Sequence, residues 1–161
     1  GVSSKLSDLK RYEGFYPNYS REVTILSPEV VKDILYAKRL NTSDMFYNNL
    51  ALNNPFGLTD ARGSLSEFKS LDAGVQAFIS KVERTYDQLA SMNYNQQLEL
   101  IKDRHLISSS EYFHSTQRHA DRLAQSLDNL NMSVKESNRI AASKVGRIPT
   151  MSAPIPGRRY T

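Results

Sequence analysis

The feature that most constrains this fold is a long helical pattern near the C-terminus. From Ser110 to about Val145, apolar, small and aromatic residues recur mainly at spacings of three and four, as an amphipathic helix requires. The stripe is thin, and a helix of this kind needs a partner surface because intrinsic propensity rarely stabilises it alone. We expect it to pack on its own domain or on another subunit. Its members are Tyr112, Thr116, His119, Leu123, Leu127, Leu130, Val134 and Ala141.

Shorter helical patterns fill the preceding part of the chain. We predict helices over residues 3–12, 28–40, 42–52, 71–89 and 94–103, with Ser27 and Ser70 as N-caps and Pro28 in the first helical position. Turn residues between 53 and 68 predict a loop with a small β-hairpin around 57–68. The expected fold is mostly α: a helical domain over 1–103 with a minor β-hairpin, a long helix over 104–145, and an extended tail over 146–161.

Composition excludes several classes of chemistry. The chain of 161 residues has no cysteine, so it has no disulfide, thiol nucleophile or cysteine-based zinc site. No apolar run approaches the length of a membrane span. Residues 1–103 carry a net charge of −1 and residues 104–161 a net charge of +5, which favours an anionic partner for the C-terminal part or simply aids solubility. The three histidines are interpreted as solvated surface residues, and neither a metal site nor a cofactor is implied.

Two short motifs carry a functional signal. Residues 53–58 read "NNPFGL", and ten residues later residues 68–78 read "FKSLDAGVQAF". Together they resemble peptidoglycan-cleaving domains of the lysozyme-like superfamily, such as bacterial glucosaminidases and the muralytic domains of phage virions. The resemblance covers residues 30 to 90. It implies a lysozyme-like fold and a glycan cleft closed by Asn53, Asn54, Phe56 and Gly57. Tyr16 is the fifth candidate substrate-binding residue, because a tyrosine ring can stack on a sugar, although it could equally fill the core.

The position of the catalytic acid departs from this family. The family's glutamate is expected near the end of the helix before the motif, where this chain has Lys38 and Arg39. A lysozyme-type mechanism needs a carboxylic acid to protonate the glycosidic oxygen. A second stretch, "KRYEGFYPNY" at residues 10–19, resembles the opening of phage-type lysozymes, in which Glu13 would be the general acid. The alternative interpretation of Glu13 is a surface charge at a helix end.

Three functions therefore stay open, one of them an unrelated helical assembly adaptor in which the "NNPFGL" motif is a coincidence. The first is a structural component of a phage virion with a degenerate peptidoglycan-hydrolase-like domain, whose helix and tail bind neighbouring virion proteins. The second is an active peptidoglycan glycosidase or lytic transglycosylase with Glu13 as the acid, acting at the bacterial cell wall. The tail contains three prolines and is interpreted as a docking arm. Its arginines could also contact nucleic acid, for which no recognition motif is present. The candidate partner-binding residues are Arg147, Arg158, Arg159 and Tyr160.

Overall fold

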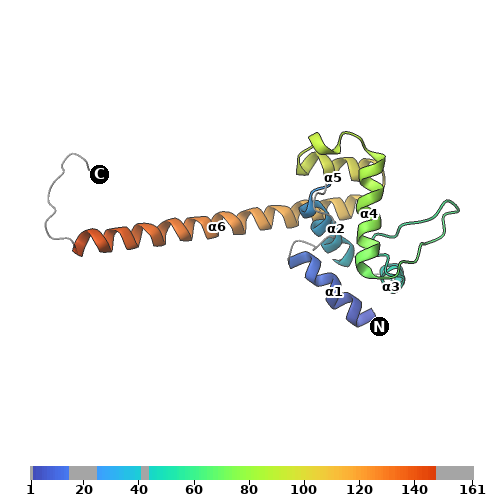
Figure 1. The fold of residues 1–161 in the computed structure, drawn as a ribbon, viewed down its shortest axis with the longest axis horizontal. Coiled ribbons are helices and arrows are strands. Elements are labelled where there is room, and N and C mark those ends of the chain that lie inside the picture. The colour runs from blue at the N-terminus through green and yellow to red at the C-terminus, as the bar shows by residue number, and fades with distance from the viewer. Residues whose placement is uncertain (1, 15–24, 41–43, 148–161) are drawn as a thin grey trace. The chain divides into compact units, whose positions relative to one another are not determined.

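The computed structural model describes residues 2–14, 25–40 and 44–147, with side chains from residues 4–10, 25–40 and 44–144. Its contacts divide the chain into two compact units, residues 1–120 and 121–161. The described residues form six α-helices and one short 3₁₀ helix (Figure 1). No helix among them is long and apolar enough to cross a membrane. The mostly helical class predicted from the sequence is therefore confirmed.

The first unit begins with α1 (Val2–Gly14), which packs against α2, α3 and α4. Helix α2 (Pro28–Leu40) starts where the sequence predicts, because the Ser27 hydroxyl accepts a hydrogen bond from the Glu29 amide at 3.2 Å. The N-terminal end of α3 (Asp44–Ala51) adjoins undescribed residues, and its C-terminal carbonyl at Ala51 accepts a bond from Lys5 Nζ at 2.7 Å.

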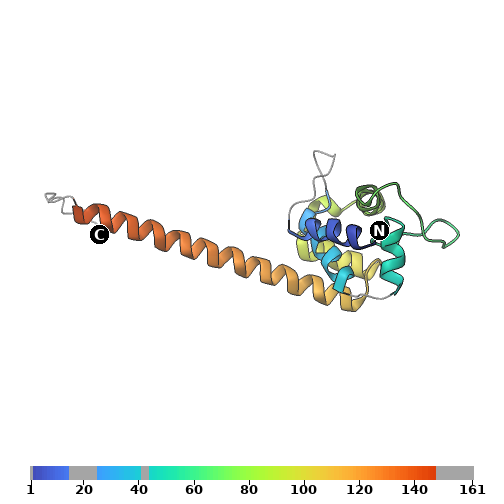
Figure 2. The same cartoon turned by 90° about the horizontal axis from the view of Figure 1, so that it is seen from below.

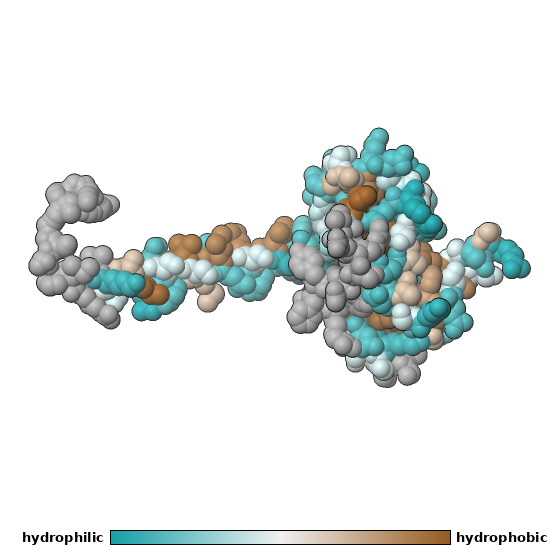
Figure 3. Space-filling view, in the orientation of Figure 1, coloured by the Kyte–Doolittle hydropathy of each residue, from teal (hydrophilic) through white to brown (hydrophobic). Residues whose placement is uncertain are grey.

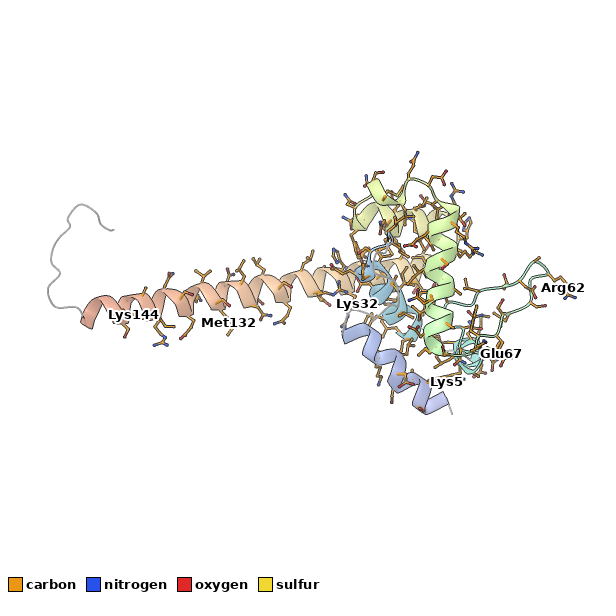
Figure 4. All side chains as sticks on the ribbon, in the orientation of Figure 1. Lys5, Lys32, Arg62, Glu67, Met132 and Lys144 are labelled. Atoms are coloured by element: carbon orange, nitrogen blue, oxygen red, sulfur yellow. The ribbon has the colours of Figure 1, made fainter. Side chains whose placement is uncertain are left out.

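A long loop joins α3 to α4 (Leu71–Thr85) and extends away from the helices of this unit, with Arg62 at its tip (Figure 4). The predicted β-hairpin is not confirmed in this loop. Among the described residues no strand forms, and one antiparallel bridge joins Thr59 to Leu65. The loop is shaped by two backbone bonds that flank this bridge, by side-chain hydrogen bonds, and by two glycines with positive φ, Gly57 and Gly63.

Helix α4 begins at its predicted cap, since Ser70 Oγ accepts a hydrogen bond from the Ala73 amide at 3.1 Å. The 3₁₀ helix η1 (Leu89–Ser91) leads to α5 (Tyr94–Asp103), which opens with a capping box between Asn93 and Gln96. The last helix, α6 (Ser109–Arg147), is continuous in both views of Figures 1 and 2. It ends two residues beyond the predicted helix.

A single apolar core holds the first unit together. Helix α4 contributes Val75, Phe78, Ile79 and Val82, and α1, α2, α3 and α5 add their own buried aliphatic side chains. Two polar side chains anchor the segment that precedes α2. Glu83 accepts hydrogen bonds from the amides of Ile25 and Leu26, and the buried Gln97 amide bonds Ser27, Ile25 and Leu89. Such contacts satisfy backbone groups that would otherwise be buried without a partner.

Candidate functional site

The "NNPFGL" turn is organised by one buried amide. Asn54 is fully buried, and its Nδ2 donates to the carbonyl oxygens of Leu58 and Ser66 at 2.8 and 2.9 Å. Its Oδ1 accepts a hydrogen bond from the Leu58 amide at 2.9 Å. One side chain therefore clamps both arms of the loop at its base, beside the backbone bond from the Ser66 amide to the Leu58 carbonyl at 3.0 Å.

The neighbouring residues fit this turn to α4. Asn53 has a φ of 58°, and its side-chain amide donates to the Phe68 carbonyl at 2.8 Å. A Cβ atom on Gly74 would lie 1.9 Å from the Asn53 carbonyl oxygen, so glycine is required for α4 to approach the turn this closely. Phe56 is 5% exposed and its ring stacks on that of Phe78 at 3.8 Å. The two halves of the motif are thus one packed unit.

Four of the five predicted substrate-binding residues are brought together by this turn. Asn53 and Asn54 both use their amide groups within the loop, Phe56 is buried, and Gly57 supplies a positive φ of 67°. These observations give each residue a structural role, and binding of a glycan stays a prediction. The fifth, Tyr16, lies outside the described residues.

The position where the family has its acid is occupied by a buried ion pair. Lys38 Nζ lies 3.1 Å from Glu111 Oε1, and the two side chains are 16% and 8% exposed. Glu111 also accepts a hydrogen bond from the Ser108 amide at 2.9 Å, while its own amide bonds the Ser108 hydroxyl. Glu111 therefore caps the start of α6 and neutralises Lys38 at the end of α2. No local sequence pattern pairs Lys38 with Glu111, which lies 73 residues further along the chain.

A second polar cluster lies where α2, α5 and the start of α6 meet. The buried Asp33 carboxylate accepts a hydrogen bond from the Tyr94 hydroxyl, and Ser115 Oγ donates to the Asp33 carbonyl at 3.3 Å. His119 stacks on the Tyr94 ring at 3.6 Å, with its Nδ1 4.0 Å from Asp33 Oδ2. The expectation that His119 is a solvated surface residue is wrong, because this stacking covers its ring.

Burial determines the protonation of this cluster. Desolvation lowers the pKa of His119, although the charge of Glu29 opposes this shift. Desolvation also raises the pKa of Tyr94, and Glu29 and Tyr112 add to that effect. The imidazole and the phenol are therefore both neutral at pH 7. The cluster holds three elements together: α2, α5 and the start of α6. Among the described residues, no group of acidic and histidine side chains could hold a metal ion.

Two arginines share a tyrosine next to this cluster. The guanidinium carbons of Arg118 and Arg39 lie 4.3 and 5.4 Å from the centre of the Tyr36 ring. This is the usual geometry of a cation–π contact. Arg39, the second cation at the predicted acid position, thus also contacts a side chain of the same chain, the Tyr36 ring.

The remaining predicted site residues are placed only in part. Glu13 lies in the last turn of α1, as expected for a helix end, and its side chain is outside the described part of the chain. Arg147 is the last residue of α6. Arg158, Arg159 and Tyr160 lie outside the described residues, so their docking role stays a prediction.

Apolar side chains lie exposed along the part of α6 that belongs to the second unit. Leu123, Leu127, Leu130 and Val134 are 54%, 57%, 60% and 50% exposed. Figure 3 shows hydrophobic side chains gathered along one edge of this helix. We refer to these four residues as the α6 stripe. Four large apolar residues at spacings of four, three and four are typical of a helix that binds another surface.

Comparison of the chain with family models, with curated proteins and with solved structures gives no match.

Proposed function

We propose that this chain is a structural component of a phage virion, in which a hydrolase-like unit serves as a scaffold and α6 with the tail binds neighbouring subunits. The observation that carries the proposal is the α6 stripe. Its four side chains are at least half exposed in the isolated chain. Burying apolar surface stabilises an assembly by about 25 cal/mol per Å². A helix built in this way gains its stability from a partner.

The position expected for the acid supports a role without catalysis. Lys38 occupies the end of α2 and is neutralised by Glu111 rather than being free to act on a substrate. Neither a paired ammonium group nor a carboxylate that caps a helix and binds lysine fits the role of a general acid. The amides of the "NNPFGL" turn are likewise engaged within the loop.

Two measurements test this function. Mass spectrometry and immunogold labelling of phage particles purified from the source culture should detect the chain as a stoichiometric particle component. Purified peptidoglycan should show neither loss of turbidity nor released glycan fragments with the wild-type protein or with Glu13→Gln. Absence of the chain from particles would contradict the structural role. Cleavage by the wild type that is lost in Glu13→Gln would instead establish a muralytic enzyme.

A further inference from the structure

The α6 stripe has the spacing of a coiled-coil seam. When residues 120–144 are written as heptads, the core positions a and d are separated alternately by three and four residues. The a positions are Ala120, Leu127, Val134 and Ala141, and the d positions are Leu123, Leu130, Ser137 and Lys144. Every one of these residues is exposed, so the seam is open along its whole length.

Side-chain size divides this seam into two halves. The three leucines lie before Met132, whereas Val134, Ser137 and Ala141 lie after it. In a parallel pair of helices, each residue faces the same residue of the partner helix. Leucine would then face leucine at one end of the seam, and serine would face serine and alanine would face alanine at the other end. In an antiparallel pair of helices, each a position faces a d position of the partner helix, and each leucine faces a residue smaller than itself. Alternating large and small residues across an interface fills its layers evenly.

Charge divides the same segment in the same way. Residues 120–131 contain Asp121, Arg122 and Asp128, a net charge of −1. Residues 133–144 contain Lys135, Glu136, Arg139 and Lys144, a net charge of +2. An antiparallel pair places the acidic half of one helix beside the basic half of the other. It also places Lys144 opposite Ala120 and next to Asp121, where the lysine stem covers apolar surface and its ammonium group meets a carboxylate.

We propose that the α6 stripe is covered by a second copy of this chain, in an antiparallel two-helix coiled coil centred on Met132. Its core layers are Leu130 with Val134, Leu127 with Ser137, and Leu123 with Ala141, each present twice. A two-fold axis relates the helices, so the contact is self-complementary and closes at a dimer. This inference deepens the proposed assembly role and rests on it, because it names the partner of the same stripe.

The first experiment measures the mass of the full chain in solution. Light scattering after size exclusion should give twice the 18.3 kDa of one chain. Leu127→Asp and Leu130→Asp should each shift the protein to a monomer because a buried charge without a partner is costly. These side chains are already exposed in the single chain, so circular dichroism should show that the first unit stays folded.

Met132→Asp is the matched control. Met132 is 68% exposed and lies on the opposite face of α6, so this variant should stay dimeric.

The second experiment determines the orientation of the helices. The chain has no cysteine, so single substitutions give unambiguous cross-links. Leu123→Cys and Ala141→Cys, co-refolded and oxidised, should form a mixed disulfide dimer, while each variant alone should cross-link little. Asp128→Cys, on the side away from the seam, should not cross-link in either setting. A disulfide dimer formed by Ala141→Cys alone would show parallel helices and overturn the proposal.

A monomeric wild type at every concentration tested, or a mass above that of a dimer, would also overturn the proposal. Neither result would contradict the assembly role itself. That role fails when the chain is missing from virions or cleaves peptidoglycan. The two sets of results are therefore distinguishable.

Discussion

Individual side chains, rather than strands, hold the loop between α3 and α4 in place. Asn54 bridges Leu58 and Ser66, Asn53 reaches Phe68, and Asp60 Oδ1 accepts bonds from the Arg62 and Ser64 amides near the tip. These side-chain bonds act together with the backbone bonds from the Ser66 amide to the Leu58 carbonyl and from the Asp60 amide to the Ser64 carbonyl. Much of the loop therefore depends on a few positions.

Asn54→Ala should destabilise the protein by about 2 kcal/mol, because the part-buried Leu58 amide and Ser66 carbonyl lose their side-chain partner, while the Leu58 carbonyl keeps its bond from the Ser66 amide. Urea denaturation followed by circular dichroism measures the free energy of unfolding. The control is Asn48→Ala, at an exposed position of α3, which should change that free energy by less than about 0.5 kcal/mol. Equal losses from both variants would mean that the clamp contributes nothing specific.

His119 should make stability dependent on pH. Its pKa in the folded protein is lowered below the value of about 6.5 in the unfolded chain. At pH values between these two pKa values the unfolded state binds a proton that the folded state does not, so acidification favours unfolding. The contribution is fully present above pH about 6.5 and is lost as the pH falls towards the folded pKa.

Thermal unfolding between pH 8 and pH 5 measures this dependence. The melting temperature of the wild type should fall below pH about 6.5, and His119→Gln should show a smaller fall. His105→Asn, which changes an exposed histidine with a positive φ of 60° to a residue that tolerates this backbone, should keep the wild-type profile. The idea fails if His119→Gln and the wild type lose stability in parallel.

At the scale of elements, the start of α6 is tied to α2 by two polar contacts, the Lys38–Glu111 pair and the Asp33–Ser115 bond. Lys38→Met should cost about 1–3 kcal/mol, because it leaves Glu111 charged in a mostly buried setting. Lys38→Met combined with Glu111→Gln should cost less than the sum of the single changes, which a double-mutant cycle in urea measures. Lys135→Met, on the exposed part of α6, is the control. A coupling free energy of zero in this cycle would show that the Lys38–Glu111 pair does not stabilise the protein.

Helix starts were the part of the fold that could be predicted well. Ser27 with Pro28 and Ser70 with its apolar stripe are local signals, since each cap bonds an amide two or three residues away. The predicted hairpin is not confirmed: its turn residues lie around Gly57 and Gly63, but one antiparallel bridge between Thr59 and Leu65, with two flanking backbone bonds, is too short to form strands.

The polar contacts of the candidate site could not be predicted in the same way. Asp33 bonds Tyr94, which lies 61 residues later in the sequence, and Lys38 bonds Glu111, which lies 73 residues later. No local pattern links such residues, since only the packing of α2 against α5 and the start of α6 brings them together. One signal was available: Ser108 followed three residues later by Glu111 is a capping-box pattern, which marks the helix start and places a carboxylate there.

For the whole molecule, the two units should differ in local stability. Residues 111–119 of α6 contribute buried side chains to the first unit, whereas residues 123–144 are exposed throughout. Hydrogen exchange followed by mass spectrometry should show slow amide exchange in peptides from 98–119. Exchange in peptides from 123–144 should be fast at low protein concentration and slower as concentration rises. Leu130→Asp should abolish the concentration dependence and leave the first region unchanged. Uniform slow exchange along α6 in dilute protein would contradict this.

The Asn54 clamp also has a practical consequence for engineering. Because the loop is closed at its base by bonds to Leu58 and Ser66, the exposed residues 59–65 can change with little effect on the core. Exposed loop tips of this kind accept inserted sequence well. A short epitope or fluorophore-binding peptide placed between Arg62 and Gly63 would give this protein a handle that touches neither the packed motif nor α6. Protein carrying it could then be captured or imaged without altering a terminus.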